Sequence, residues 1–574
     1  MIILGINDGF EAGAAVIKNG KIVSAINEER ISRIKLHQGH MHGWPYASVR
    51  EAMRLAKVTP DDIDLIAVAG IVDPPIPARL AGYFGWNSGK KKRVEIKAGA
   101  GKLKRIAYNW FSDQRSNSIT GKTSITLIKP IYRKFLKKLN LDGIKTIFID
   151  HHMCHSSAAY YTSGLKRALV VTMDGHGDGL SGTIRTYDNG KLIETIAVTP
   201  SKNSIGWFYS QVTHVLGFKM HRHEGKITGL AAYGNPDTNY SAFEKAVQAD
   251  TSKLQTINNL GHKYDGVIKL RKITKGMRRE DVAAAAQRRF EEVITQIISA
   301  AVKRTGISDV ALAGGCFANV KLNQRIIELP NVKSIFIHPH MGDGGLAVGA
   351  ALACYGKEAS KPKTYKLNDV YFGTSFTNEQ IETELKKSNK KYEYIKDIEK
   401  VIAEKLAEGK IIGRFNGRGE YGPRALGNRS ILADPTDSTI NDWLNKRLNR
   451  TEFMPFAPSC LDTHAKKYFI NYKRAEYPAR FMTITFDCTK EAETCPAVVH
   501  VDKTARPQIV SEKQNKSYYK TLKAWKKESG LGMFINTSFN MHEEPILQTP
   551  HDAVRAFNKG AVDLLAIGNY LVEK

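Results

Sequence analysis

Three histidines lie within the hexapeptide at 150–155, Asp-His-His-Met-Cys-His. His151 and His155 are four residues apart, so on a helix both imidazoles would lie on one face, as two ligands of one metal ion often do. An isolated pair with this spacing can equally be two surface or core histidines. Here the pair follows an expected strand at 146–149, which favours a metal site. With Asp343 as the expected oxygen ligand, the set would suit iron(II), zinc or manganese.

Three arginines fall within twelve residues and are set among glycines; they are Arg418, Arg424 and Arg429. Guanidinium groups match phosphate oxygens in a bidentate way. One of the three could instead be a structural ion-pair partner, but the cluster as a whole predicts a phosphate site. Ser538 and Asn540 follow an expected strand, and they could hold the same ligand or cap a loop.

An internal duplication is the most informative feature of the chain. Residues 2–26 contain an apolar strand, an Asp-Gly loop, a second strand and an Asn-Gly turn, and residues 168–194 repeat this order. An Asn-Gly pair between apolar runs predicts a β-hairpin, because both turn residues take positive φ. Glycines in each loop would let backbone amides approach a phosphate. The layout resembles the actin/sugar-kinase/Hsp70 (ASKHA) type of nucleotide-binding fold.

The remaining segments predict an α/β chain with two domains. We expect further strands at 146–149, 310–313, 334–338, 411–415, 482–486 and 532–535, and helices at 281–298, 319–327 and 342–354. The polar stretch 356–364 contains helix breakers and predicts a linker. It separates residues 1–355 from residues 366–574.

Charge distinguishes this composition. The 574 residues include 85 Lys or Arg and 57 Asp or Glu, a formal net charge of +28. Residues 90–138 carry fifteen basic and two acidic side chains, with aromatic residues in and beside them, and residues 513–527 form a second lysine-aromatic cluster. Cations beside rings suit a nucleic acid. They equally suit solvated helix faces whose aromatic residues pack inward, and a lysine-rich proteome would give the same charge.

The rest of the composition predicts a cytoplasmic globular protein. No stretch approaches the roughly 18 uninterrupted apolar residues of a membrane helix. The first residues lack the pattern of a signal peptide. Six cysteines occur without a C-x-x-C pair, which predicts reduced thiols.

Ordered motifs cover nearly the whole chain. They are Asn27–Arg30 with Arg33, His151–His155, Met173–Gly177, Glu224–Gly234, Gly314–Asn319, Gly342–Gly345, Gly417–Ser430, Met454–Pro458 and Asn536–Asn540. In this order they resemble the carbamoyltransferase family typified by NodU and the antibiotic O-carbamoyltransferases. The resemblance implies a Kae1-like ASKHA domain at 1–355, with a basic insertion at about 85–140, and a YrdC-like domain at 366–574.

The resemblance also implies a two-centre reaction. The YrdC-like domain would bind ATP with Mg²⁺ and carbamoyl phosphate and form carbamoyl-adenylate. The Kae1-like cleft, with a metal expected to be Fe²⁺, would transfer the carbamoyl group to an acceptor hydroxyl. Asp174 and Lys226 would be catalytic. The implied cofactor-binding residues are Arg418, Arg424, Arg429, Arg450, Ser538, Asn540, Gly175, Gly314, Gly315 and Asn319.

One position departs from the family pattern. The first loop of the family usually carries a histidine, the natural candidate to deprotonate the acceptor, whereas here Asn7-Asp8-Gly9 is followed by Phe10 and Glu11. Glu11 is therefore a candidate catalytic base; the other candidates are His37, His40 and His42. Alternatively, a primary alcohol near the metal needs little base, or the chemistry is slow, altered or lost.

The shared motifs leave the acceptor open, and the charge suggests a polyanion. Our hypothesis is a hydroxymethylated pyrimidine, 5-hydroxymethylcytosine, in DNA bound by residues 90–138, as in a virus-encoded modification system acting in the host cytoplasm. One of Trp86, Trp110 and Phe111 would then stack on an extruded base. The alternatives are a sugar, a nodulation-factor-like glycan or a secondary metabolite as acceptor, a tRNA threonylcarbamoyl-type enzyme, and a non-catalytic nucleic-acid-binding relic. A homodimer is also possible.

Overall fold

The computed structural model describes residues 1–84, 113–448 and 456–573. The chain divides into two compact units: a first unit of residues 1–29 and 36–367, and a second unit of residues 30–35 and 368–574. The expected linker at 356–364 lies in the first unit. Helix α14 (Leu346–Glu358) extends into it, and the backbone N–H of Tyr365 donates to the carbonyl of Tyr161.

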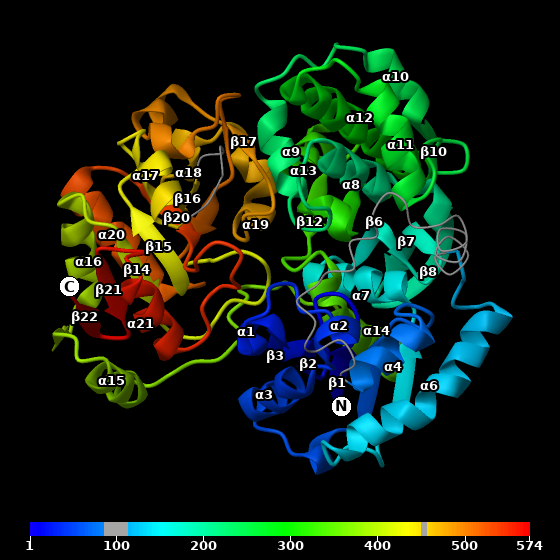
Figure 1. Ribbon diagram of the computed structural model, residues 1–574, viewed down its shortest axis with the longest axis horizontal. Helices are drawn as coiled ribbons and strands as arrows, with labels where there is room; N and C mark the ends of the chain where they lie inside the picture. The colour runs from blue at the N-terminus through cyan, green and yellow to red at the C-terminus, as the bar shows by residue number, and fades with distance from the viewer. Residues whose placement is uncertain (85–112, 449–455, 574) are drawn as a thin grey trace. The chain divides into compact units, whose positions relative to one another are not determined.

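Two five-stranded sheets with the same strand order build the first unit (Figure 1). One has the order β3 (Lys21–Asn27), β2 (Gly13–Lys18), β1 (Ile2–Asn7), β4 (Leu65–Ala69) and β5 (Thr146–Ile149). The other has the order β8 (Lys191–Pro200), β7 (Leu180–Asp188), β6 (Arg167–Gly177), β11 (Asp309–Ala313) and β12 (Ser334–Ile337). In each, an antiparallel three-stranded meander continues into two parallel strands. The predicted duplication and ASKHA-type fold are confirmed.

The Asn-Gly turns have the backbone that the sequence predicts. Asn19 and Gly20 take φ of 50° and 77°, and Asn189 and Gly190 take φ of 50° and 82°. Both residues of each pair are thus in the left-handed region that matches the twist of a two-residue hairpin. These turns set the register of β2 on β3 and of β7 on β8.

Helices pack on both sheets of the first unit. α14 covers β1, β2 and β4, α7 (His151–Ser163) covers β6 and β11, and the two helices pack against each other. Strands that are buried on both faces of a sheet have continuous runs of apolar residues in their sequences, as β1 and much of β6 do. The other helices are α1 (Glu29–Ser32), α2 (Gly39–His42), α3 (Tyr46–Ala56), α4 (Ile76–Tyr83), α6 (Ile119–Lys137), α8 (Ile205–Val215), α9 (Glu224–Ala231), α10 (Tyr240–Ala246), α11 (Lys263–Ile273), α12 (Arg279–Thr305) and α13 (Val320–Glu328), with a small β9 (Val247–Asp250)–β10 (Gln255–Asn258) ribbon.

The second unit contains one mixed eight-stranded sheet. Its order is β13 (Tyr392–Tyr394), β22 (Tyr570–Val572), β21 (Leu564–Ile567), β14 (Ile412–Phe415), β15 (Arg429–Ala433), β20 (Met533–Ser538), β16 (Ala457–Leu461) and β19 (Gln508–Val510). Its helices are α15 (Asn378–Lys387), α16 (Ile398–Ala407), α17 (Ile440–Arg447), α18 (Ala465–Tyr468), α19 (Glu476–Ala479), α20 (Lys516–Ser529) and α21 (Pro550–Asn558). This is the expected α/β class; the closer YrdC resemblance remains a prediction.

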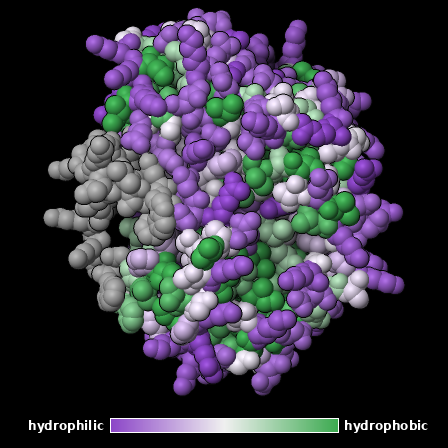
Figure 2. Space-filling view, turned by 90° about the vertical axis from the view of Figure 1, so that its right-hand side faces the viewer, coloured by the Kyte–Doolittle hydropathy of each residue, from purple (hydrophilic) through white to green (hydrophobic). Residues whose placement is uncertain are grey.

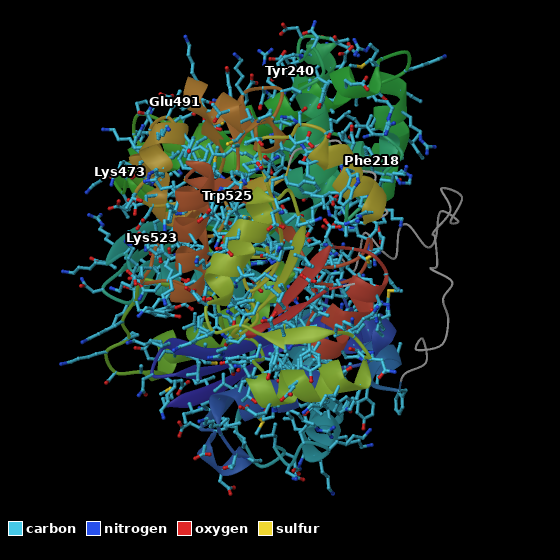
Figure 3. All side chains as sticks on the ribbon, turned by 90° about the vertical axis from the view of Figure 1, so that its left-hand side faces the viewer. Phe218, Tyr240, Lys473, Glu491, Lys523 and Trp525 are labelled. Carbon is cyan, nitrogen blue, oxygen red and sulfur yellow. The ribbon has the colours of Figure 1, made fainter. Side chains whose placement is uncertain are left out.

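The lysine-aromatic cluster at 513–527 is an amphipathic helix. Tyr518 and Trp525 of α20 are buried in the core beneath the sheet, and the indole N–H of Trp525 donates to the carbonyl of Met533 at 2.8 Å. The lysines of α20, Lys523 among them, are exposed (Figure 3). Because the rings face inward, they are not free to stack on nucleic-acid bases, and the solvated-face interpretation is correct here.

The described part of the basic segment behaves in the same way. Tyr132 and Phe135 of α6 are buried, and their rings pack on Trp44 with centroids 4.8 and 5.0 Å away. The candidate base-stacking residues Trp86, Trp110 and Phe111 lie outside the described residues, as does Arg450.

One expected strand is wrong. Of residues 482–486 only Phe486 is in a strand, β17 (Phe486–Asp487), which pairs with β18 (Thr504–Ala505). Met482 takes a φ of 55°, and the hydroxyl of Thr483 donates to the carbonyl of Pro478. An apolar run with a left-handed residue at its start cannot continue as an extended strand.

The surface is mostly hydrophilic, with small hydrophobic groups between the polar side chains on the face shown in Figure 2. Ile119, Leu127 and Ile193 are among the exposed large apolar residues. Within residues 1–84, 113–448 and 456–573, no helix combines the length and apolar character needed to cross a membrane.

Helix α14 crosses the histidine-bearing helix α7 at close range. A Cβ on Gly349 of α14 would lie 2.1 Å from the carbonyl oxygen of Cys154 on α7. Gly349→Ala should therefore force the helices apart and lower the free energy of unfolding by about 1–3 kcal/mol, the usual cost of overpacking. Thermal unfolding monitored by circular dichroism measures the shift. Gly143→Ala is the control, because a Cβ added there would meet nothing within 4 Å. Equal melting temperatures for the two variants would contradict this role for Gly349.

Candidate functional site

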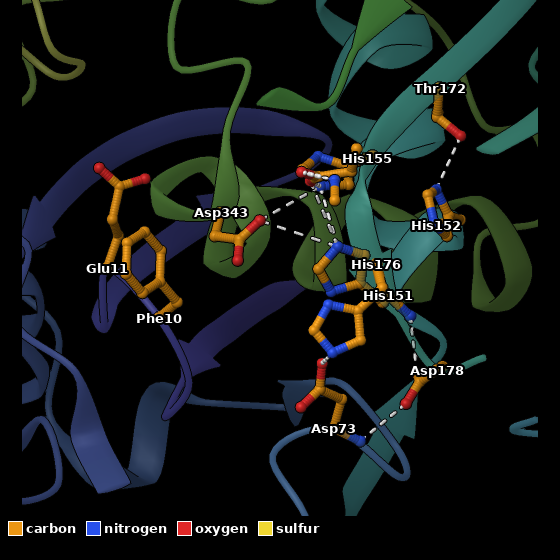
Figure 4. Close-up of polar contacts among 12 residues, drawn as sticks. Phe10, Glu11, Asp73, His151, His152, His155, Thr172, His176, Asp178 and Asp343 are labelled. Carbon is orange, nitrogen blue, oxygen red and sulfur yellow. Dashed lines mark hydrogen bonds and ion pairs between the residues drawn. The ribbon is translucent and has the colours of Figure 1, made fainter. Parts of the chain in front are cut away.

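Four side chains of the first unit bring metal-binding atoms together. They are His151, His155, Asp174 and Asp343, and one donor atom from each lies within 4.8 Å of all the others. Nε2 of His155 is 3.2 Å from Nε2 of His151 and 3.0 Å from Oδ2 of Asp174. Oδ1 of Asp343 is 3.7 Å from Nε2 of His151 and 3.6 Å from Nε2 of His155 (Figure 4).

These separations fit one divalent cation. Donor atoms bound at about 2.1 Å are about 3.0 Å apart at right angles and about 3.4 Å apart at tetrahedral angles. The imidazoles are buried, whereas the side chains of Asp174 and Asp343 are 16% and 20% exposed. The carboxylate side therefore remains open for a further ligand. His151, His155 and Asp343 are brought together as the sequence predicts, and Asp174, expected to be catalytic, joins them as a fourth donor.

The carboxylate of Asp178 holds the start of the histidine helix. It accepts the backbone N–H groups of Val72 and Asp73 after β4, at 2.7 and 2.9 Å, and that of His151 at 2.9 Å. Asp150 caps the same helix end by accepting the N–H of Met153. Because Asp178 lies between β6 and β7, it joins the loops of both duplicated halves.

Close packing and hydrogen bonds hold the helix that carries the two candidate metal ligands, His151 and His155. Gly177 has no side chain because a Cβ there would lie 2.1 Å from the ring of His151. On the neighbouring side, Arg185 donates to the carbonyl of His152 at 2.8 Å and to the hydroxyl of Ser156. Burial, the largest effect, lowers the pKa of His152 well below its usual value, so this imidazole is neutral beside Thr172.

Electrostatics couple the four donors. Burial disfavours ionisation of Asp174, but hydrogen bonds with His151 and His155 outweigh it and hold its pKa well below the usual range. Burial likewise opposes protonation of His151, yet the hydrogen bond to Asp174 and the charge of Asp343 raise its pKa to about 10. A proton thus compensates the carboxylates here, and a divalent cation would take over that compensation.

The first loop brings Glu11 next to the Asp343 turn. Its Oε2 accepts the backbone N–H of Gly344 at 3.0 Å, and Asn7 donates to the carbonyls of Phe10 and Asp343. Burial and the nearby carboxylates Glu29 and Asp343 raise the pKa of Glu11 to about 8. Phe10 packs near His221, with ring centroids 6.1 Å apart.

The alternative bases lie in and beside α2. Nε2 of His37 is 2.8 Å from the carbonyl of Gly43, its ring packs on His42, and Nδ1 of His42 accepts the N–H of Gln38. His40 lies in the same short helix. These contacts give His37 and His42 a part in holding the turn.

A second imidazole beside the donor group was missed by the sequence analysis. Nε2 of His176 is 3.7 Å from Oδ2 of Asp73, and its ring lies 5.2 Å from that of Trp207. Figure 4 shows His176 next to His151, with Asp73 beyond it. In the sequence, the glycines of the loop at 174–179 indicate a role for the backbone and not for the side chain of His176. Asp73 is distant in the sequence and comes close to His176 only in the folded chain.

The glycines expected to bind the nucleotide border Asp174. The N–H of Gly175 donates to Oδ1 of Asp174 at 2.6 Å, and a Cβ on Gly315 would lie 3.0 Å from that oxygen. Gly314 takes a φ of 103° because its Cβ would meet the carbonyl of Met173. The backbone at Gly314 therefore requires glycine, and Gly315 leaves the space beside the carboxylate clear.

Two other expected residues lie farther along this region. Asn319 caps α13 by accepting the N–H of Leu322 and exchanges hydrogen bonds with the amide of Gln287. Lys226, on α9, is buried with its Nζ 5.7 Å from the ring centroid of Phe218.

In the second unit, two of the three clustered arginines bind backbone carbonyls. Arg429 donates to the carbonyls of Asn416 and Thr374, among others, and stacks on Phe415 at 3.7 Å. Arg418 donates to the carbonyls of Gly373 and Phe372. These contacts hold the loop that precedes β15, so they give both arginines a structural task.

The third arginine, Arg424, lies near another arginine, Arg506, instead of binding carbonyls. Within the described residues, Arg424 and Arg506 form no hydrogen bond or ion pair, and their buried Nε atoms are unsatisfied. Burial lowers the pKa of Arg424 to about 10; burial and the charge of Arg424 lower that of Arg506 well below its usual value. Two partly desolvated cations near each other are unfavourable without an anion. Arg506 follows β18 in no recognised motif, so no local pattern in the sequence indicates its role.

The last expected residues lie at the end of β20. Ser538 pairs in register with Ser430 of β15. Asn540 donates to the carbonyls of Met541 and Glu544 at 2.9 Å, the loop-capping alternative considered for it.

Comparison with known proteins defines the class. A family model of the carbamoyltransferase N-terminus matches residues 2–352, and a family model of the carbamoyltransferase C-terminus matches residues 403–574. With the ASKHA-type first unit, these matches define an α/β group-transfer enzyme. The chain belongs to the carbamoyltransferase family.

Relatives span the full chain. It is 32% identical to the uncharacterized protein MJ1051 of Methanocaldococcus jannaschii, over 100% of both chains. It is 31% identical to nodulation protein NolNO of Sinorhizobium fredii, over 98% of this chain and 79% of that one. It is 29% identical to a 3'-hydroxymethylcephem-O-carbamoyltransferase of Streptomyces clavuligerus, over 45% of this chain and 47% of that one. Among solved structures, phosphate- and nucleotide-bound HypF has a TM-score of 0.30 at 13% identity, covering 63% of this chain and 56% of that one.

The donor geometry makes a prediction about metal content. His155→Ala and Asp174→Asn should each reduce the bound divalent metal from about one ion per chain to a small fraction, because each removes a ligand. Elemental analysis after dialysis measures this content. His551→Ala is the control, since that exposed histidine pairs with Glu384 in the second unit. If Asp174→Asn retains its metal while His155→Ala loses it, Asp174 is not a ligand.

Proposed function

We propose that the chain is an ATP-dependent O-carbamoyltransferase that works in two steps. In the first, water splits carbamoyl phosphate into carbamate and phosphate, and carbamate attacks the α-phosphate of ATP to give carbamoyl-adenylate and pyrophosphate. In the second, an acceptor hydroxyl attacks the carbamoyl carbon, and the carbamate ester and AMP are released. Family membership supports the reaction class. The observation that carries the two-step form is the pair of guanidinium groups of Arg424 and Arg506 in the second unit, whose buried Nε atoms have no hydrogen-bond partner among the described residues.

The second unit would perform the activating step. Arg424 and Arg506 are the proposed ligands of a phosphate group, because an anion would compensate two partly buried positive charges that no described side chain neutralises. Arg418 and Arg429 would contribute by holding the loop. Ser538, Asn540 and Arg450 remain proposed contacts for carbamoyl phosphate or ATP with its Mg²⁺.

The first unit would perform the transfer. Gly315 leaves the space beside the Asp174 carboxylate clear, and Gly175 and Gly314 adjoin Asp174 and Gly315 in the chain, which supports a position there for the phosphate of the adenylate. Lys226 and Asn319 remain proposed contacts to the same ligand, with Asn319 also acting as a helix cap.

The four donor residues suit a divalent cation. Held by His151, His155, Asp174 and Asp343, it would polarise the carbonyl oxygen of the carbamoyl group as a Lewis acid. Two imidazoles and two carboxylates match iron(II), zinc and manganese. Fe²⁺ is the ion that the family resemblance favours.

Glu11 is the proposed base for the acceptor hydroxyl. One carboxylate oxygen is anchored by the N–H of Gly344, and the other forms no hydrogen bond within the described part of the chain. An anchored carboxylate with one free oxygen can accept a proton in a fixed direction. It lies one residue after Phe10, where the family usually has its imidazole.

The proposed acceptor is a hydroxyl of a glycan or small metabolite. A relative that matches most of the chain is named a nodulation protein, and one that matches about half of it is named a cephem O-carbamoyltransferase. These names support a carbohydrate or a small alcohol as the acceptor. A DNA acceptor has less support. The rings at 132, 135, 518 and 525 pack inward, and the remaining aromatic residues of the basic segment lie outside the described residues.

The central test is the activating step on its own. With ATP, Mg²⁺ and carbamoyl phosphate, the full chain should release pyrophosphate only when both substrates are present. Arg424→Ala and Arg506→Ala should lower this release about 100-fold, as the loss of a charged transition-state contact typically does.

The same variants separate ligand binding from folding. Neither arginine has a hydrogen-bond or ion-pair partner among the described residues, so the melting temperatures of these two variants should stay constant or rise. Arg429→Ala should instead unfold at a lower temperature. Arg480→Ala, which removes an arginine paired with Glu476, is the matched control with normal pyrophosphate release. Normal turnover in both Arg424 and Arg506 variants would overturn the assignment of the phosphate site.

Glu11→Gln should separate the two steps. Glutamine keeps an oxygen for the N–H of Gly344 but accepts no proton, so transfer to the acceptor should fall about 100-fold or more while pyrophosphate release is unchanged. Acceptor carbamoylation from labelled carbamoyl phosphate measures the first quantity. Normal transfer by this variant would exclude Glu11 and direct attention to His176.

A further inference from the structure

A short segment of the N-terminal sequence belongs to the second unit. Residues 30–35, which we call the strap, leave the first unit after Glu29 and return at Leu36. The N–H of Leu36 donates to Oε2 of Glu29 at 2.8 Å, so the strap is closed at its base. It contains the two arginines of the Asn27–Arg30 and Arg33 motif, which the proposed function has not used.

Arg30 holds the loop that carries Arg424. Its side chain is buried, and Nη2 donates to the carbonyl of Gly422 at 2.8 Å. Gly422 has a φ of 116°, a conformation that few other residues adopt, and it precedes Arg424 by two residues. By fixing the direction of the Gly422 carbonyl, Arg30 therefore helps to fix the position of the backbone at Arg424.

Arg33 holds the loop that carries Asn540. Its Nη1 and Nη2 donate to the carbonyls of Ile546 and Pro545, both at 2.9 Å. Its Nε lies 3.4 Å from Oδ1 of Asp552, whose other carboxylate oxygen accepts the N–H of Thr549, the N-cap of α21. The N–H of Leu547 donates to the carbonyl of Phe539, so the loop that starts at Asn540 is closed where Arg33 binds it.

The strap thus reaches both loops of the candidate anion site. Its two guanidinium groups bind backbone carbonyls, and no substrate contact is needed for them to act. Hydrogen bonds from a charged donor to a carbonyl are stronger than those from a neutral donor. One planar guanidinium group can also hold two carbonyls at a fixed distance from each other.

We propose that Arg30 and Arg33 are positioning residues of the carbamoyl-phosphate site, so that the N-terminal sequence completes the activating centre of the second unit. This rests on the proposed function, which supplies the ligand. Arg30 orients the loop of Arg424, and Arg33 orients the loop of Asn540. Loss of either contact shifts the ligand-binding groups, and a displacement of about 1 Å can cost about 100-fold in rate.

The test uses the full chain with Arg30→Gln, Arg33→Gln and the corresponding lysine variants. Pyrophosphate release should fall 10- to 100-fold in the glutamine variants, roughly the effect of a small misplacement, with a raised KM for carbamoyl phosphate. Lysine should restore part of the rate at position 30, because the contact with the Gly422 carbonyl needs one donor. It should restore less at position 33, where two donors bind two carbonyls. Arg54→Gln, which loses only an exposed pair with Glu51, is the control.

Binding of inorganic phosphate, measured by calorimetry, separates the two proposals. Weaker phosphate binding in Arg30→Gln and Arg33→Gln, with metal content and circular dichroism unchanged, supports the strap even if no pyrophosphate is released. Phosphate binding and turnover equal to wild type in both variants overturns it. A wild-type chain that binds phosphate but releases no pyrophosphate contradicts the proposed function alone. A glutamine variant that unfolds is replaced by its lysine variant, whose normal KM would also overturn the strap.

Discussion

The carboxylate of Asp178 is the interaction on which the first unit depends most. It accepts backbone N–H groups from the loop after β4 and from the first residue of α7, although it lies between β6 and β7. One side chain therefore ties together loops of both duplicated halves. With these loops fixed, Asp174 at the end of β6 and the histidines of α7 meet at distances that suit a single ion.

The two units compensate charge in opposite ways. The first unit collects carboxylates around two imidazoles, and this group favours a cation. In the second unit, Arg424 and Arg506 are partly buried and have no counter-charge among the residues that the structure describes, and this pair favours an anion. In the first unit a proton on the imidazoles compensates the carboxylates, whereas the arginine pair is unfavourable without a ligand, because buried charge needs a partner. Such local conflicts between burial and charge are expected where a ligand completes the structure.

Local patterns in the sequence predicted much of the fold and part of the site. The Asn-Gly turns specify hairpins through backbone conformation, and the four-residue spacing of His151 and His155 specifies one helix face. Features that depend on the tertiary structure were harder to predict. Arg506 becomes significant only because the fold brings it to Arg424, and the apolar run at 482–486 is interrupted by a left-handed residue that its composition does not reveal.

The strap has a consequence for how such chains can diverge. Residues 30–35 come from the N-terminal sequence but pack among the loops of the C-terminal unit. A chimera joined after residue 367 would combine the strap of one parent with the loops of another. Recombination at this apparent domain boundary would thus separate residues that must match, and the two halves are expected to be inherited together rather than exchanged as independent modules.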